Sequence, residues 1–150
     1  MDRVRASLIA LGIANPQIKT FDDSTATAEQ AAAAIGTSVA SIVKSLVFMA
    51  GDSPIVVLVS GANRADTAKL QALLGVPIKR ANADQVHNAT GFAIGGVPPV
   101  GHPQPLHTVI DRDLLQYEQV WAAAGTHTSV FPIAPRQLVS ITSGHVADIT

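Results

Sequence analysis

SIVKSLVFMAGDSPIVVLVS, residues Ser41 to Ser60, holds two apolar runs on either side of the short polar segment GDSP. Two runs of this kind, joined by a turn segment, predict a β-hairpin. The second run, IVVLVS, is apolar at consecutive positions and therefore on both faces of a strand. Such a strand is expected at the centre of a sheet, where both of its faces are covered.

The sequence on either side of this hairpin mixes helix and strand signals. Thr27 with Gln30 fits a capping box at the start of a helix, and Gly36 comes directly after the last residue of that helix. Helices and strands do not alternate strictly, and the hairpin favours antiparallel or mixed pairing. The sequence therefore predicts an α/β (α+β) fold, in which a mixed, barrel-like β-sheet carries flanking helices. Helices are expected over 3–11, 27–35, 66–75, 82–89 and 134–142, a helical turn over 113–117, and further strands over 17–21, 76–81, 106–111, 119–125, 129–133 and 145–149.

Length and composition limit the class of protein. With 150 residues, 47% of them hydrophobic and 14% charged, the chain is expected to form a single globular domain over residues 1–150. Cysteine is absent, which excludes disulfides, thiolate zinc sites and a thiol nucleophile. No run of about 18 apolar residues is present and the first residues are too polar for a secretory signal, so we expect no membrane contact and a cytoplasmic location.

The balance of charges limits the partners. The formal net charge is −1, and the ten Lys and Arg residues are scattered, with only Lys79 and Arg80 adjacent. A protein that follows a long phosphate backbone usually carries a basic stripe, so extended nucleic-acid binding is not expected. Capture of one or two terminal nucleotides stays open.

Lys44 is an anomaly within the predicted hairpin. On a strand it shares one face with Ile42, Leu46 and Phe48, which are all apolar. A lysine in this setting either extends its ammonium group to the rim of the sheet or occupies a pocket with a partner. The pattern leaves both interpretations open.

The segment TGFAIGGVPPVGH, from Thr90 to His102 and called here the Gly/Pro loop, cannot form a long helix or strand. The pair Gly95-Gly96 allows close approach of the backbone or a turn with positive φ, and Pro98-Pro99 stiffens the residues after it. Backbone N–H groups on such a rigid loop can bind an anion or an oxyanion, although a purely structural turn has the same composition. The segment is neither a Walker A loop nor a dinucleotide-binding fingerprint.

The remaining polar residues show no familiar catalytic pattern. The five histidines lack a metal-binding spacing, so no metal site is predicted, and no serine stands in a Gly-x-Ser-x-Gly setting. Asp111 ends the run HTVID at the expected rim of the sheet. It could orient a substrate amine or cap the helical turn that begins at Arg112, and the sequence leaves both interpretations open.

Six segments, taken in order, carry a resemblance to a known family. IVKSLVF, TGFAIGGVPPVGH, HTVID, AAAG, PRQLVSIT and VADI are similar to the YbaK family of aminoacyl-tRNA editing domains, which includes the insertion domain of bacterial prolyl-tRNA synthetases. The resemblance runs from about Thr20 to Ile149. It implies the YbaK/prolyl-tRNA synthetase-associated domain fold and hydrolysis of the ester between a wrong amino acid and the 3′ end of a tRNA. It also implies that no metal or organic cofactor takes part.

The resemblance implies roles for individual residues. Lys44 matches the family's essential lysine, which holds the terminal nucleotide. Gly95 and Pro99 match its Gly-x-x-x-Pro loop, whose backbone positions the reacting carbonyl or a water, with help from the 2′-hydroxyl of the terminal ribose. The expected catalytic residues are Lys44, Gly95, Gly96 and Pro99, and the expected substrate contacts are Thr20, Phe21, Ser45, Val97, Pro98, Gly101, His102 and Asp111.

Three features of this sequence limit what the resemblance implies. The AAAG segment, Ala122 to Gly125, is less polar than its Ser/Gly-rich counterpart in cysteine-specific members, which argues against a cysteine substrate. His102 stands only in some branches of the family, so a contact from His102 to a polar side chain or to the ribose is a hypothesis from this sequence. Phe21 can equally be a core residue.

These observations predict a free-standing deacylase that acts in trans. Its expected substrate is a small amino acid mischarged on a tRNA, above all tRNA(Pro), recognised at the 3′ CCA end. Prolyl-tRNA synthetase is the expected protein partner and a monomer the expected state. The alternative is a non-catalytic module that binds aminoacyl-tRNA, a nucleotide or a synthetase, and a third interpretation is a hydrolase of another small ester or amide. The sequence does not choose the amino acid.

Overall fold

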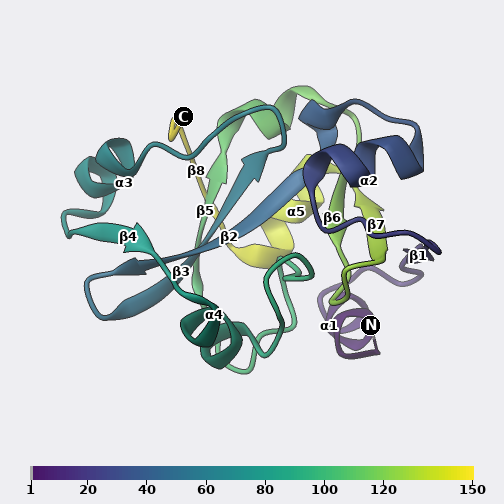
Figure 1. Ribbon diagram of the computed structural model, residues 1–150, viewed down its shortest axis with the longest axis horizontal. Coiled ribbons are helices and arrows are strands. Elements are labelled where there is room, and N and C mark those ends of the chain that lie inside the picture. The colour runs from purple at the N-terminus through teal and green to yellow at the C-terminus, as the bar shows by residue number, and fades with distance from the viewer. Residues whose placement is uncertain (1) are drawn as a thin grey trace.

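The computed structural model describes residues 2–150, so Met1, the first residue of the expected domain, lies outside the described residues. The strands are β1 (Lys19–Thr20), β2 (Val43–Ala50), β3 (Ser53–Ser60), β4 (Ile78–Arg80), β5 (His107–Asp111), β6 (Val120–Ala123), β7 (Ser129–Ile133) and β8 (His145–Ala147). The α-helices are α1 (Asp2–Ala10), α2 (Ala28–Ile35), α3 (Thr67–Leu74), α4 (Ala83–Thr90) and α5 (Pro135–Thr142), with 3₁₀ turns η1 (Val39–Ser41) and η2 (Arg112–Gln116). The strands form a five-stranded sheet, ordered β4-β2-β3-β5-β8, and a three-stranded sheet, ordered β1-β7-β6 (Figure 1).

The predicted hairpin is confirmed and lies at the centre of the larger sheet. β2 and β3 pair antiparallel over their whole lengths, from Val43 opposite Ser60 to Ala50 opposite Ser53. The residues from Ile55 to Ser60 are all buried, as the consecutive apolar run predicts. β3 then pairs parallel with β5, and β5 pairs parallel with β8, so the sheet is mixed.

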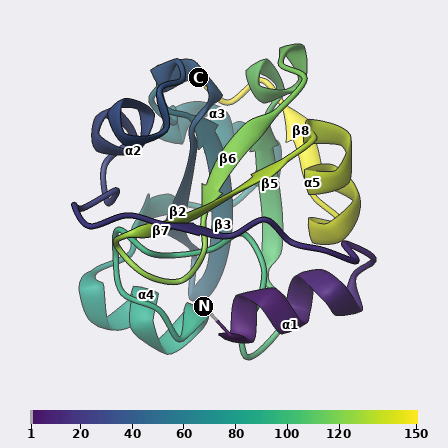
Figure 2. The same ribbon diagram turned by 90° about the vertical axis from the view of Figure 1, so that its right-hand side faces the viewer.

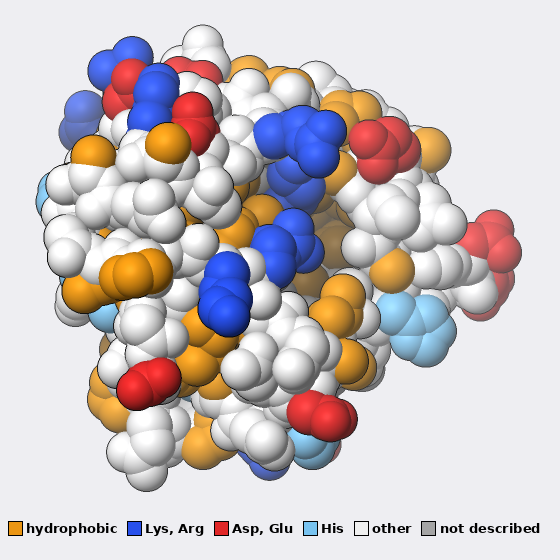
Figure 3. Space-filling view, turned by 60° about the vertical axis from the view of Figure 1, so that its left-hand side comes forward, with side chains coloured by type: hydrophobic (Ala, Val, Ile, Leu, Met, Phe, Trp, Pro, Cys, Tyr) orange, Lys and Arg blue, Asp and Glu red, His pale blue; other side chains and the backbone are white. Residues whose placement is uncertain are grey.

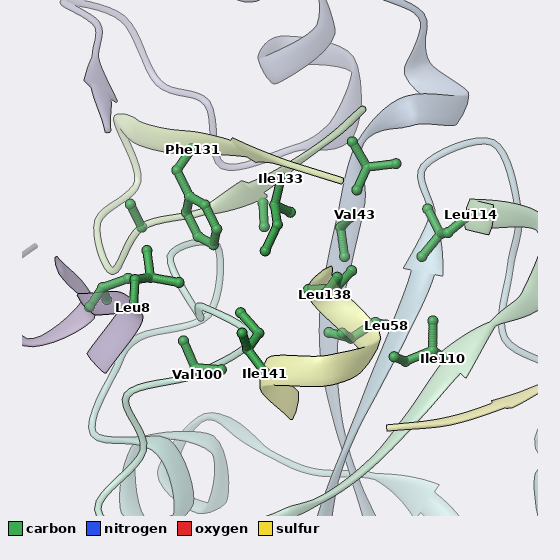
Figure 4. Packing of buried hydrophobic residues seen from close by; sticks show 14 of the residues in the cluster. Leu8, Val43, Leu58, Val100, Ile110, Leu114, Phe131, Ile133, Leu138 and Ile141 are labelled. Atoms are coloured by element: carbon green, nitrogen blue, oxygen red, sulfur yellow. The ribbon is translucent and has the colours of Figure 1, made fainter. Parts of the chain in front are cut away.

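The two faces of β3 contribute to two separate hydrophobic clusters. On one face Leu58 packs in a cluster to which α1 and α5 contribute Leu8 and Leu138 (Figure 4). On the other face Val57 packs in a cluster that includes Leu70 of α3. Burial of one such side chain contributes roughly 1.5–3 kcal/mol, so cover on both faces fixes the position of the hairpin.

The smaller sheet lies against the start of β2 (Figure 2). Ile42, directly before β2, forms a parallel bridge with Trp121 of β6. The expected mixed sheet with flanking helices is therefore confirmed. Its strands are divided between two sheets that meet at this bridge, and they do not form one closed barrel.

Helix α2 is fixed beside the start of β2 by its N-terminal cap and by the chain before it. The predicted capping box is present, because the Thr27 side chain accepts from the backbone N–H of Gln30 and the Gln30 side chain accepts from that of Thr27. Gly36 ends the helix in the left-handed conformation, with φ 81°. Before the helix, the Thr25 N–H donates to the carbonyl of His127 at 2.7 Å, and the buried alanines of α2 pack beside Ile42.

Residues 2–150 contain neither a membrane-spanning helix nor a cluster of metal-binding side chains. None of their helices has the length and apolar character needed to cross a membrane. They also bring together no group of three or more His, Cys, Asp or Glu side chains that could hold a metal ion.

Candidate active site

A cavity of about 300 Å³, called here the β2 cavity, opens between α2, the start of β2, the Gly/Pro loop and β6. Small apolar side chains, many of them alanines, form much of its lining. Among its polar, charged or loop residues are Thr25, Thr27, Glu29, Lys44, Ser45, Arg80, Ile94, Gly95 and Val97. Of the expected site residues, the structure thus brings Lys44, Ser45, Gly95 and Val97 together here.

Lys44 is the second residue of β2 and lines this cavity. Its Nζ donates to the backbone carbonyl of Asn63, a residue shortly after β3. Burial lowers the pKa of Lys44 from its ordinary value, and the charges of Arg64 and Arg80 act in the same direction, whereas Glu29 opposes them. Of the two interpretations from sequence, the bond to Asn63 matches the one in which the lysine has a partner.

Asp111 helps to hold the carbonyl that Lys44 binds. Its carboxylate accepts from the side chain of Asn63 at 2.9 Å and from the backbone N–H groups of Ser60 and Asp113. Asp111 is 1% exposed and lies outside the lining of the β2 cavity. The expectation of a substrate contact is corrected here: Asp111 caps η2 and orients Asn63, because both of its oxygens are already bonded within the fold.

The first half of the Gly/Pro loop faces the β2 cavity. Gly95 has φ +94°, a conformation that a residue with a side chain rarely adopts. Among residues 2–150, no hydrogen-bond acceptor pairs with the backbone N–H of Gly95 or of Val97. The fold itself therefore does not use these two groups as donors.

Gly96 has a different role from the one expected. Its N–H donates to the carbonyl of Ala93 at 3.1 Å, so that group is already used within the loop. A Cβ at Gly96 would lie 2.9 Å from the carbonyl carbon of Thr126 and 3.2 Å from its nitrogen. The missing side chain allows the loop to pack backbone against backbone on the segment before β7.

The second half of the loop faces away from Lys44. Pro99, Gly101 and His102 line a separate cavity of about 480 Å³ on the side of α5. Pro98 is buried between the two, and its carbonyl accepts from His102 Nε2 at 2.8 Å. A carbonyl can only accept, so Nε2 carries the proton of the neutral ring. Pro99, expected in the catalytic set, thus stiffens the loop from behind and does not line the β2 cavity.

We predict that His102 makes stability depend on pH. Burial lowers its pKa from the ordinary value of 6.5, while the bond to Pro98 acts the other way. The unfolded chain therefore binds more protons than the folded one as the pH falls below about 6.5, and the free energy of unfolding falls with it. His102→Gln, which keeps an N–H donor, should remove this part of the pH dependence of the free energy of unfolding. Thermal melts from about pH 7.5 to 5 check it, and equal pH dependence of the two proteins would contradict it.

Thr20 and Phe21 lie outside the lining of both cavities. Thr20 pairs with Ser129 at the edge of the smaller sheet. Phe21 packs against the cluster that contains the buried alanines of α2, and its N–H donates to the carbonyl of Thr128 at 2.9 Å. The alternative interpretation of Phe21 as a core residue describes its observed position.

The sequence did not indicate a role at the site for three residues, Arg80, Glu29 and Asn63. Arg80 reaches the cavity from β4 and its guanidinium lies 5.5 Å from the centre of the Phe48 ring, while Glu29 comes from the first turn of α2. Asn63 supplies the carbonyl that holds Lys44. Figure 3 shows Lys and Arg side chains gathered around a hollow with hydrophobic side chains inside it. The only signal in the sequence was the adjacent pair at 79–80, since the other contacts join distant segments.

Comparison with known proteins identifies the family of this chain. A sequence model of the aminoacyl-tRNA editing domain matches residues 22–141. A solved structure described as a candidate trans-editing enzyme for prolyl tRNA synthetase superposes with a TM-score of 0.95 at 44% identity, over 99% of this chain and 95% of that one.

Several curated proteins are similar to this chain in sequence. The protein YwhH of Bacillus subtilis is 33% identical over 122 residues, which is 81% of this chain and 78% of YwhH. EbsC of Enterococcus faecalis, named as a candidate Cys-tRNA(Pro)/Cys-tRNA(Cys) deacylase, is 27% identical over 125 residues, 82% of this chain and 76% of EbsC. A proline–tRNA ligase of Streptococcus sanguinis is 31% identical over 101 residues, 67% of this chain and 15% of the ligase. With the family match over most of its length and the same fold as a solved member, this chain belongs to the aminoacyl-tRNA editing domain family.

Proposed function

We propose that residues 1–150 form one editing domain that hydrolyses the ester between a small amino acid and the 3′ end of tRNA, with tRNA(Pro) as the leading substrate. It would act in trans, beside a separate prolyl-tRNA synthetase, in the cytoplasm and as a monomer. The observation that carries the proposal is the β2 cavity of about 300 Å³, which Lys44, Gly95 and Val97 line together.

This set of groups suits the hydrolysis of an activated ester. A water, oriented with help from the ribose 2′-hydroxyl, attacks the carbonyl carbon, and the negative charge of the transition state develops on the carbonyl oxygen. The free N–H groups of Gly95 and Val97 are the proposed donors to that oxygen. Collapse of the intermediate breaks the bond to the ribose 3′-oxygen, which leaves with a proton. No strong protein nucleophile is needed, because the substrate is already activated and positioned.

Lys44 is the proposed holder of the terminal nucleotide. Its ammonium group can bind a phosphate or ribose oxygen, since it is a compact cation with three donors. The bond to Asn63 uses only one donor and fixes the direction of the side chain. Arg80 lines the same cavity and adds a second positive charge to the proposed binding surface for the CCA end.

The lining favours a small, apolar amino acid. Ala28 and Ala31 of α2, and Ala122 and Ala123 of β6, line the space together with Trp121. The alanine side chains offer a polar substrate side chain no hydrogen-bond partner in return for its lost bonds to water. Alanine is therefore the amino acid we propose first, and cysteine ranks lower.

A deacylation panel tests this proposal. The purified protein is incubated with tRNA(Pro) charged with Ala, Ser, Cys, Thr or Pro, and with cognate alanyl-tRNA. We expect turnover of alanyl-tRNA(Pro) above the others. A folded protein that hydrolyses none of these esters would contradict the proposal and favour the non-catalytic binding module.

Ser45 provides a second, smaller prediction. Ser45 lines the β2 cavity, and its buried hydroxyl oxygen has no hydrogen-bond partner within residues 2–150. A buried hydroxyl without a partner costs stability, and a bound substrate would satisfy it. Ser45→Ala should therefore keep or slightly raise the melting temperature and slow deacylation about fivefold to tenfold. Parallel melts and rate measurements check this, and a fall in stability with no loss of rate would contradict it.

A further inference from the structure

We infer that Glu29 recognises the free α-amino group of the substrate, so that the site selects aminoacyl esters that carry a protonated amine. This inference rests on the proposed function and adds a chemical requirement to it. Glu29 is the second residue of α2 and lines the β2 cavity together with Lys44. Of the residues that line the cavity, it is the only one with a carboxylate.

The carboxylate of Glu29 is not occupied within the fold. Among residues 2–150 it takes part in no ion pair and no hydrogen bond. The cap of α2 does not use it either, since Thr27 and Gln30 make that cap between them. An exposed side chain with no structural partner, at the edge of a cavity, is free to bind a ligand.

The other charges of the cavity explain why a carboxylate is needed. Lys44 and Arg80 are both cations, and both line the same space. A substrate ammonium group that entered it would be repelled by these two charges, and one negative side chain offsets that repulsion. Glu29 also acts on Lys44 across the cavity, where its charge favours the protonated ammonium. The site can therefore hold a phosphate or ribose oxygen at Lys44 and an ammonium at Glu29 at the same time.

This arrangement predicts which esters the domain hydrolyses poorly. A carboxylate binds a charged ammonium with a strong hydrogen bond, but it gains much less from a neutral hydroxyl or an acylated nitrogen. Esters of N-acylated amino acids, including the growing peptide on a tRNA, would therefore be poor substrates. The requirement for a free amine would restrict hydrolysis to newly charged tRNA.

The test compares two substrates of nearly equal size, alanyl-tRNA(Pro) and lactyl-tRNA(Pro), in which a hydroxyl replaces the amine. Rates are measured for the unmodified protein and for Glu29→Gln at about pH 6.5, below the ordinary pKa of an α-amino group of about 7.7. Glu118→Gln makes the same change at an exposed position that lines neither cavity. Melting curves establish that each variant is folded.

We expect the unmodified protein to prefer the alanyl ester, and Glu29→Gln to slow that ester on the order of tenfold, mainly through KM. The rate on the lactyl ester should stay within about twofold, and Glu118→Gln should change neither rate. An equal effect of Glu29→Gln on both esters, or no effect on either, would overturn this inference while the deacylase function stands. Failure of the unmodified protein to hydrolyse either ester would instead overturn the proposed function.

Discussion

Replacement of Lys44 by methionine is expected to slow the hydrolysis of alanyl-tRNA(Pro) by at least about 100-fold, the magnitude typical for loss of one group that stabilises or positions the reacting ester. Methionine keeps most of the length and apolar surface of the side chain and removes only the charge. The bond to the carbonyl of Asn63 disappears with it, but Asn63 is only half-buried, so water can reach that carbonyl. Rates at several substrate concentrations will separate binding from the chemical step.

Two further variants make the Lys44 prediction specific. Lys79→Met removes an exposed lysine from β4, which pairs with the same strand β2, and should leave the rate unchanged. Lys44→Arg keeps the charge but should restore little activity, because a planar guanidinium cannot occupy the place of a compact ammonium. A Lys44→Met protein that retains half of its activity would exclude Lys44 from the reaction.

Replacement of Gly96 by alanine should disrupt the wall of the β2 cavity. The added methyl group would lie 2.9 Å and 3.1 Å from backbone atoms of Thr126, and backbone yields less readily than a flexible side chain. Overpacking of this kind costs about 1–3 kcal/mol, so we expect a lower melting temperature. Displacement of Gly95 and Val97 should also slow deacylation on the order of 100-fold in the protein that remains folded.

Gly51→Ala is the matched control for this change. Gly51 lies in the turn of the hairpin with φ +61°, and a Cβ there would meet nothing within 4 Å. It should cost about 1–2 kcal/mol through backbone strain alone and leave the rate of the folded protein unchanged. If Gly96→Ala behaves like Gly51→Ala in both measurements, the loop does not depend on its contact with Thr126.

The sequence predicts the local elements well, because their signals lie within a few residues of each other. The capping box at Thr27, the glycine after α2 and the covered strand β3 all appear as expected. The division into two sheets could not be predicted, since it depends on the bridge between Ile42 and Trp121, which are far apart in the chain.

In the candidate site too, local features could be predicted from the sequence and contacts between distant segments could not. Lys44 and the Gly/Pro loop are visible in the sequence through unusual composition, whereas Glu29 reaches the same cavity because α2 packs against Ile42 and Trp121. An aspartate at the end of a strand, such as Asp111, has the same sequence pattern whether it caps a helical turn or contacts a substrate. Only its burial and bonding partners distinguish the two.

The most direct test of the proposed site is to locate where the aminoacyl end binds. A stable analogue, adenosine with alanine joined through an amide at the 3′ position, is titrated into ¹⁵N-labelled protein and followed by NMR. We predict that the largest shifts fall on the amides of Ser45, Gly95 and Val97, and that Lys44→Met weakens them. Shifts concentrated around His102 and Thr108 would place the ligand in the second cavity and contradict the β2 cavity as the active site.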